Sequence, residues 1–265
     1  VGKAVADAGF QAAYFSGGAT TVAAGVPDVG LLTLDHFARE IKQVVHASQL
    51  PLIADADTGF GEEEMIRRTV LEYNFAGAAG LHLEDQVFPK RCGHLDGKEL
   101  VSVEQMVSKV QWAAKASEDY SDGAFMICAR TDAKGVDGFD AAVERAKAYV
   151  EAGASMIFPE GLTSEQEFAD FAKAMDAMGD KRPYLLANMT EFGKTPMLTL
   201  DQFGAMGYNI VIYPVSTLRI AMGAVARALA ELKQTGTLEG QLGNMQTRQE
   251  LYDLVGYTPG TPWEM

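Results

Sequence analysis

Seven short apolar runs, rich in residues that favour β-strands, recur along the chain and predict the strands of a sheet. They lie at residues 12–17, 51–57, 80–85, 125–130, 156–161, 184–189 and 209–215. The segments between them have helical spacing, and one such face carries Phe168, Phe171, Ala172, Met175 and Met178. Alternating strands and helices favour a parallel sheet covered by helices, because a parallel connection needs a crossover of about a dozen residues.

Glycines stand where several predicted helices end and the next strand begins, a position that favours a left-handed backbone. They are Gly9, Gly77, Gly153, Gly179 and Gly207. The fold class is therefore α/β. The length of 265 residues matches the ~250 residues of one (β/α)8 barrel and favours it over an open sheet.

The number of strands differs from the eight of such a barrel, since seven are visible and the chain opens inside a helix. We therefore expect the first strand of the native polypeptide to be missing from this sequence. No Pro/Ser-rich linker divides residues 1–265, which we interpret as a single barrel domain. Residues 216–265 have no strand pattern and predict a helical C-terminal extension that packs outside the barrel or on a partner.

The charge and the cysteines exclude several classes of protein. The chain has 22 basic and 36 acidic residues, a net charge of -14, which repels phosphate backbones and anionic lipid, so we expect no nucleic-acid or membrane partner. No apolar stretch approaches the ~18 to 20 residues of a membrane span, and the first residues lack a signal-peptide layout. Two cysteines, Cys92 and Cys128, indicate a reducing, cytoplasmic location.

Polar side chains end six of the predicted strands, where barrel enzymes place their chemistry. These residues are Tyr14, Ser16, Asp55, Asp57, His82, Glu84, Arg130, Glu160 and Asn188. A charged residue after one strand is an ordinary start of a surface loop, but six coincident cases indicate a shared polar site. His82 is either a group close to the ligand or a satisfied core histidine.

Asp55, Asp57 and Glu84 would repel one another in such a site unless a cation offsets them. Oxygen ligands of this kind suit Mg²⁺, or Mn²⁺ in its place. Because Mg²⁺ takes one or two direct carboxylates and keeps several waters, some of the three would act through water. The alternative is that each carboxylate pairs with a basic side chain: Lys90, Arg91 or Arg130. Zinc has no support, since HExxH and CxxC are absent.

The segment EDQVFPKRCGH, residues 84–94, places Cys92 between Lys90, Arg91 and His94. Neighbouring cations lower a thiol pKa and prepare it for proton transfer or attack. Cys128 lies inside an apolar run, and we interpret it as a core residue.

A candidate anion-binding segment follows the first predicted strand at Ser16, Gly17 and Gly18. Its backbone N–H groups can hold a carboxylate or a phosphate. No GxGxxG, GxxxxGK[ST] or GxSxG motif occurs.

Six motifs together resemble the isocitrate lyase/phosphoenolpyruvate mutase superfamily: SGG at 16–18, DADTGFG at 55–61, GLHLEDQ at 80–86, KRCGH at 90–94, ARTDA at 129–133 and NMTEFGKTP at 188–196. The resemblance runs from the first residue to about Tyr257. The cysteine of KRCGH marks the carbon–carbon lyases of this superfamily. YPVSTLR at 213–219 and MQTRQELY at 245–252 are similar to the branch that cleaves 2-methylisocitrate.

The resemblance implies a Mg²⁺-dependent retro-aldol cleavage of 2-methylisocitrate, a hydroxy-tricarboxylate, to pyruvate and succinate in the methylcitrate cycle of propionate breakdown. The metal would be held by Asp55, with Asp57 and Glu84 acting through water. The implied catalytic residues are Tyr14 as base, Cys92 as the acid that protonates the succinyl carbon, and Lys90 and His94. Substrate binding would fall to Ser16, Gly17, Gly18, Asp55, Arg91, Gly93, Arg130, Glu160, Asn188, Thr190 and Arg219.

The resemblance also implies that the Cys92 loop closes over the ligand and that the last helix swaps between subunits of a homotetramer. A slightly different loop follows Gly18, which leaves the role of Asp28 near the metal open. One alternative activity is cleavage of 2,3-dimethylmalate, against which Arg219 argues because a dicarboxylate has no third carboxylate for it. Isocitrate differs by one methyl, which discriminates by only ~1 to 3 kcal/mol. An alternative of another class is a non-catalytic metabolite-binding barrel.

Overall fold

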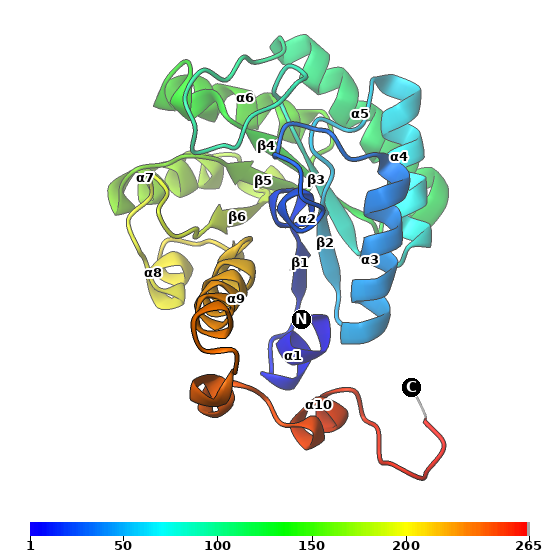
Figure 1. The fold of residues 1–265 in the computed structure, drawn as a ribbon. Helices are drawn as coiled ribbons and strands as arrows, with labels where there is room; N and C mark the ends of the chain where they lie inside the picture. The colour runs from blue at the N-terminus through cyan, green and yellow to red at the C-terminus, as the bar shows by residue number, and fades with distance from the viewer. Residues whose placement is uncertain (264–265) are drawn as a thin grey trace.

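The computed structural model describes residues 1–263, in which a parallel sheet curls into a nearly closed barrel with helices outside it (Figure 1). The strands are β1 (Ala13–Phe15), β2 (Leu52–Asp55), β3 (Gly80–Glu84), β4 (Met126–Thr131), β5 (Met156–Pro159), β6 (Tyr184–Asn188) and β7 (Ile210–Ile212). Each predicted run contains one of them, so the α/β barrel is confirmed. The strands lie in chain order, with β1 and β7 at the edges of the sheet, and an eighth strand stays a prediction.

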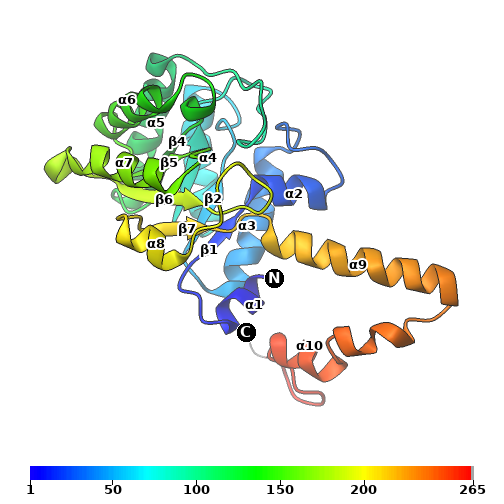
Figure 2. The ribbon, with the colours of Figure 1, turned by 90° about the vertical axis from the view of Figure 1, so that its left-hand side faces the viewer.

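The helices that connect the strands cover the outside of the sheet (Figure 1). They are α3 (Leu34–Ser48), α4 (Glu63–Phe75), α5 (Val103–Ser121), α6 (Phe139–Glu151), α7 (Glu165–Asp176) and α8 (Leu200–Ala205). The short α2 (Gly17–Ala23) lies instead beyond the carboxyl end of β1 (Figure 2). Ser102 and Gln105 form a capping box at the start of α5, which satisfies N–H groups that the helix leaves unpaired. All five glycines predicted at helix ends have positive φ.

The predicted apolar face of α7 packs into the main core, where Phe168, Phe171, Ala172 and Met175 are buried. Met178 lies beyond the end of α7 and is half-buried against the same core. Phe168 meets the rings of Phe203 and Tyr208 edge to face, with ring centroids 5.1 and 5.4 Å away. This core fixes the outer helices to the sheet.

A smaller apolar cluster fills the inside of the barrel: Ile53, Cys128, Met156, Phe158, Leu186 and Ile212. Successive residues of a strand alternate between its faces, so the residue two positions later points the same way. Asp55, Arg130, Glu160 and Asn188 each follow one of these apolar residues by two positions. The barrel interior is therefore apolar in its middle and polar at the carboxyl ends of the strands.

After β7 the chain continues as α9 (Ser216–Thr235) and α10 (Arg248–Leu254). Figure 2 shows α9 extending away from the barrel, and none of its residues is buried. Its exposed apolar side chains include Ile220, Met222, Val225, Leu229 and Leu232. The short α1 (Gly2–Asp7) precedes β1. Among residues 1–263 no helix combines the length and apolar character needed to cross a membrane.

Replacing Phe168 with alanine should lower the free energy of unfolding by about 3 to 5 kcal/mol, because the change leaves a cavity among packed rings. Urea denaturation followed by circular dichroism measures this loss. The matched control is Phe75→Ala at the end of α4, where the ring is 75% exposed and the expected change is within about 0.5 kcal/mol. Equal losses for both variants would contradict the assigned core.

Candidate active site

A cavity of about 250 Å³ lies at the carboxyl ends of the strands. Most of the predicted site residues line it: Tyr14, Ser16, Gly18, Asp55, Lys90, Cys92, Gly93, His94, Arg130, Glu160, Asn188, Thr190 and Arg219. Four others do not line it in the described chain, namely Gly17, Asp57, Glu84 and Arg91. Residues from all seven strands and the segments that follow them thus meet in one place, with Arg219 coming from α9 after β7.

Asp55, at the end of β2, is held by two backbone donors. The N–H of Gly17 donates to its Oδ2 and the N–H of Asp57 donates to its Oδ1, each over 3.0 Å. A Cβ on Gly17 would lie 2.8 Å from Asp55 Oδ2, so glycine permits this close approach. The first glycine of the predicted SGG cradle therefore binds a carboxylate of the protein, while Gly18 faces the cavity.

The two other carboxylates of the predicted metal site, Asp57 and Glu84, are also buried. Asp57 Oδ1 is 2.8 Å from Lys90 Nζ, and Glu84 Oε2 is 3.0 Å from Arg130 Nη1. Their other oxygens, Asp57 Oδ2 and Glu84 Oε1, have no hydrogen-bond donor among residues 1–263. Burial, and then the charge of Asp55, raises the pKa of Asp57 to about 6, and burial raises the pKa of Glu84 well above its ordinary value.

Lys90 provides a cation among these carboxylates. Its ammonium also contacts Asp28, which settles the place of that residue beside Lys90 at the cavity wall. Although burial acts in the opposite direction, the surrounding carboxylates, Glu84 foremost, raise the pKa of Lys90. The alternative in which basic side chains offset the carboxylates therefore holds for one oxygen each of Asp57 and Glu84.

The carboxylate oxygens of Asp57 and Glu84 that have no donor in the described part of the chain are candidates for an interaction with a metal ion. Among residues 1–263, no three His, Cys, Asp or Glu side chains form a group that could hold a metal ion by themselves. Mg²⁺ needs only one or two direct carboxylates, since water and substrate oxygens complete its shell. Buried carboxylate oxygens without a donor are costly, and a cation relieves that cost. The residues around Asp55 therefore fit a Mg²⁺ ion.

Tyr14 and His82 form a stacked pair under the cavity, with rings 9° from parallel and Tyr14 Oη 2.8 Å from His82 Nε2. Burial lowers the pKa of His82 to about 4, so the imidazole is neutral. Burial, and then the charge of Asp55, raises the pKa of Tyr14 well above its ordinary value. His82 is thus a buried neighbour of Tyr14 rather than a group on the cavity wall.

The loop that carries Cys92 follows β3 and lies on groups from β4, β5 and β6. A Cβ on Gly93 would lie 2.3 Å from Glu160 Cγ and 2.5 Å from Arg130 Nη2, so the loop backbone touches both side chains. His94 Nε2 is 3.3 Å from Glu160 Oε1, and His94 Nδ1 accepts from the Lys194 N–H over 3.1 Å. Cys92 is half-buried and lines the cavity.

Arg91 lies in the Cys92 loop but does not line this cavity. Its backbone N–H and carbonyl are bound by the side-chain amide of Gln86, each over 2.9 Å. Its exposed guanidinium donates to the Asp96 carbonyl at 3.1 Å, away from the cavity. Lys90 points inward, so its neighbour in this extended loop points outward.

Arg219, at the start of α9, reaches the cavity with its charge already paired. Its Nη1 donates to Thr190 Oγ1 (3.0 Å), to the Glu191 carbonyl (2.7 Å) and to Glu191 Oε2 (3.0 Å). Glu191 was missed by the sequence reasoning, although it directly follows Thr190 in NMTEFG. Other cavity residues missed in this way are apolar or small: Leu95, Phe158, Phe192, Gly193, Ile212, Pro214 and Val215.

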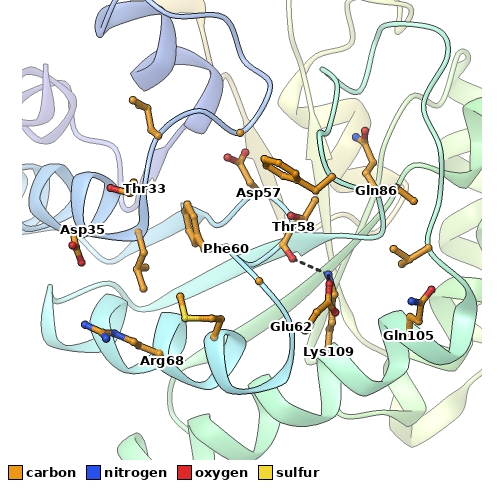
Figure 3. A pocket seen from close by; sticks show the side chains of 18 residues that line it. Thr33, Asp35, Asp57, Thr58, Phe60, Glu62, Arg68, Gln86, Gln105 and Lys109 are labelled. Atoms are coloured by element: carbon orange, nitrogen blue, oxygen red, sulfur yellow. Dashed lines mark hydrogen bonds and ion pairs between the residues drawn. The ribbon is translucent and has the colours of Figure 1, made fainter.

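A second, larger cavity of about 840 Å³ has Asp57 among the residues that line it. Figure 3 shows Asp57 and Phe60 at its walls, with Lys109 on the opposite side. Lys109 Nζ donates to the Thr58 carbonyl (3.1 Å) and is 3.2 Å from Glu62 Oε1. This lysine therefore ties the loop after β2 to α5. Among the predicted metal residues, Asp57 faces this second cavity.

The chain matches the family model of phosphoenolpyruvate phosphomutase over residues 2–233. It is 52% identical to the probable 2-methylisocitrate lyase 1 of Corynebacterium glutamicum, over 97% of this chain and 82% of that protein. The 2-methylisocitrate lyases of Aeropyrum pernix and Escherichia coli are 51% and 44% identical, over 94% of this chain in both cases and 77% and 82% of their own lengths.

Solved structures with the same fold belong to related enzymes. A 2,3-dimethylmalate lyase, described as a PEP mutase/isocitrate lyase superfamily member, has a TM-score of 0.88 at 34% identity, over 96% of this chain and 83% of that one. Oxaloacetate acetylhydrolase with the inhibitor 3,3-difluorooxalacetate has a TM-score of 0.89 at 32% identity, over 96% and 84%. Phosphonopyruvate hydrolase in complex with oxalate and Mg++ has a TM-score of 0.83 at 29% identity, over 96% and 86%.

Proposed function

Because this chain belongs to the phosphoenolpyruvate phosphomutase family and is a carbon–carbon lyase, we propose that it cleaves 2-methylisocitrate to pyruvate and succinate. The observation that carries the proposal is that the Cys92 thiol and the Tyr14 hydroxyl line one small cavity together with Arg130, His94 and Asn188. A proton acceptor, a proton donor and carboxylate-binding groups then share one substrate. The names of the similar curated proteins support this choice of substrate.

The reaction needs one proton removed and one proton delivered. Loss of the proton of the substrate hydroxyl turns that oxygen into a carbonyl as the adjacent carbon–carbon bond breaks, and pyruvate forms. The electron pair of the broken bond passes into the succinyl fragment as an enediolate. Cys92 then protonates its carbon, which completes succinate.

Tyr14 is the group that receives the hydroxyl proton. Because its raised pKa keeps the phenol protonated, Tyr14 must pass its own proton on as it accepts another. Burial disfavours protonation of His82 by lowering its pKa, but its Nε2 lies 2.8 Å from the phenol oxygen and 3.6 Å from Asp55 Oδ1, whose charge stabilises the imidazolium that forms. The pair therefore acts as a short relay leading away from the substrate.

The substrate carboxylates bind to groups around the cavity wall. Arg130, the Ser16 hydroxyl and the Gly18 N–H take the pyruvate end, since a guanidinium fork matches a carboxylate. The succinate end is bound by Gly93, His94, Asn188, Thr190 and Arg219. Glu160 holds two of these side chains in place, those of His94 and Asn188. We leave Arg91 out of this set because its side chain is turned away.

Mg²⁺ is the cofactor that we propose for the buried carboxylates: Asp55 would hold it directly, and Asp57 and Glu84 would act through water. When bound, the metal acts as a Lewis acid that stabilises negative charge on the substrate oxygen, an effect worth several kcal/mol. The donor-free oxygens of Asp57 and Glu84 support it. The Mg++ in the related phosphonopyruvate hydrolase gives further support. Mn²⁺ is the natural substitute.

A second candidate substrate is 2,3-dimethylmalate. Glu191 already pairs with Arg219, so this arginine does not require a third substrate carboxylate to offset its charge. The structural similarity to a 2,3-dimethylmalate lyase also favours this substrate. With 2-methylisocitrate as the substrate, the reaction would belong to propionate breakdown. We propose that it takes place in the cytoplasm.

A pyruvate-release assay with Mg²⁺ should give rapid turnover of 2-methylisocitrate, with succinate as co-product. Isocitrate and 2,3-dimethylmalate are assayed in parallel. Excess EDTA should abolish release and added Mg²⁺ should restore it, because the buried carboxylates need a cation. Faster release from 2,3-dimethylmalate would select the second candidate, and turnover unaffected by EDTA would contradict the metal site.

Replacing Cys92 with serine should lower kcat by about 10² to 10⁴ with little change in KM, because a hydroxyl is a far weaker acid while the binding groups stay in place. Steady-state kinetics on the preferred substrate measures both constants. Cys128→Ala is the matched control, since Cys128 lies inside β4 away from the cavity. Turnover of Cys92→Ser close to that of the control would rule out the thiol as the acid.

The protruding α9 supports a homotetramer in which this helix packs on another subunit. Apolar residues at its surface, such as Leu229, then become buried. Size-exclusion chromatography with light scattering should give about four times the 28.5 kDa of one chain. Leu229→Lys should lower this mass, whereas Gln234→Lys on the same helix should not. A monomeric wild-type protein would refute the assembly.

A further inference from the structure

We propose that Lys98 is a positioning residue that fixes the Cys92 loop against Arg130. Its side chain is 3% exposed, although lysine is normally found at the surface. Its ammonium donates to the Gly93 carbonyl and lies 3.1 Å from Asp132 Oδ1. One buried lysine therefore joins the residue after Cys92 to the residue that follows β4.

Asp132 is a rigid partner for this contact. It is fully buried, and its two carboxylate oxygens accept from Arg130 Nε and Nη2 over 3.0 and 3.1 Å. Its backbone N–H donates to the buried carboxylate of Asp85 over 2.9 Å. Asp132 is thus held from both sides, and it orients the guanidinium at the cavity wall.

Gly93 is the part of the loop that Lys98 holds. Its backbone lies so close to Arg130 and Glu160 that a Cβ would overlap both side chains. The Gly93 carbonyl points the other way, to Lys98. A buried carbonyl is costly when unpaired, so this contact with Lys98 favours the seated position of the loop.

This arrangement should affect proton delivery more than substrate binding. Asn188, Thr190 and Arg219 keep their positions without Lys98, because none of them contacts it. Cys92, one residue from Gly93, loses its fixed place when the loop lifts. Loss of Lys98 should therefore lower kcat about a hundredfold, as expected when a reacting group is misplaced, and raise KM by a smaller factor, because Gly93 and His94 of the same loop also bind the substrate. This kinetic part rests on the proposed function.

The test that does not depend on the reaction is the rate at which iodoacetamide alkylates Cys92, read by mass spectrometry of the peptides. Lys98→Met removes the ammonium at similar length, and we expect alkylation of Cys92 to become about tenfold faster, because the loop opens locally. Lys98→Gln keeps an N–H donor without charge and should lie between Met and wild type. Cys128, 1% exposed, is the internal reference and should stay unreactive.

Lys194→Met is the matched control, since Lys194 pairs with Asp96 of the same loop but at the surface. It should leave Cys92 alkylation and kcat within about twofold of wild type. An unchanged Cys92 rate in both Lys98 variants would overturn the proposal. An equal rise at Cys92 and Cys128 in both variants would also overturn it, because it would mean a general loss of packing. If wild type turned over no substrate, the proposed function would fail while the alkylation rates still decided the role of Lys98.

Discussion

The site depends on the compensation of buried negative charge by Arg130. Its guanidinium lies 3.0 Å from Glu84 at the end of β3, binds Asp132 after β4 through two nitrogens, and lies 3.7 Å from Glu160 after β5. Carboxylates this deeply buried are tolerated only when paired, and a planar fork is suited to several at once. Arg130 thereby sets the spacing of three neighbouring strand ends, on which the Cys92 loop then lies. The cavity is shaped by this charge balance as much as by apolar packing.

Most of the fold could be predicted because strands have a strict period of two and parallel strands need long crossovers. The same period explains why Asp55, Arg130, Glu160 and Asn188 could be assigned to one site. Each continues the inward face of a strand whose earlier residues are apolar, so its direction follows from the strand alone. The chemistry of these residues was therefore visible in the sequence, whereas their roles in the reaction stay predictions.

Loops have no such period, and the prediction is weakest there. Arg91 was placed in the site with Lys90, but neighbours in an extended segment point to opposite sides. Asp57 has a positive φ of 47°, which turns its carboxylate toward the larger cavity. Lys98 and Glu191 were not selected because each acts through contacts with distant segments that no local pattern encodes. Such contacts become visible only in three dimensions.

The order of the strands has a consequence for how the molecule is made. Every strand from β2 to β7 pairs with the strand that precedes it in the chain, so each new strand finds its hydrogen-bonding partner already synthesised. The ribosome delivers the chain from its N-terminus, and the sheet can grow one strand at a time in the same direction. Pairing between neighbours also keeps the sequence separation of contacts short for a parallel sheet, which favours rapid folding. The active-site mouth is complete only late in translation, when β7 and the start of α9 with Arg219 join the groups supplied by β1 to β6.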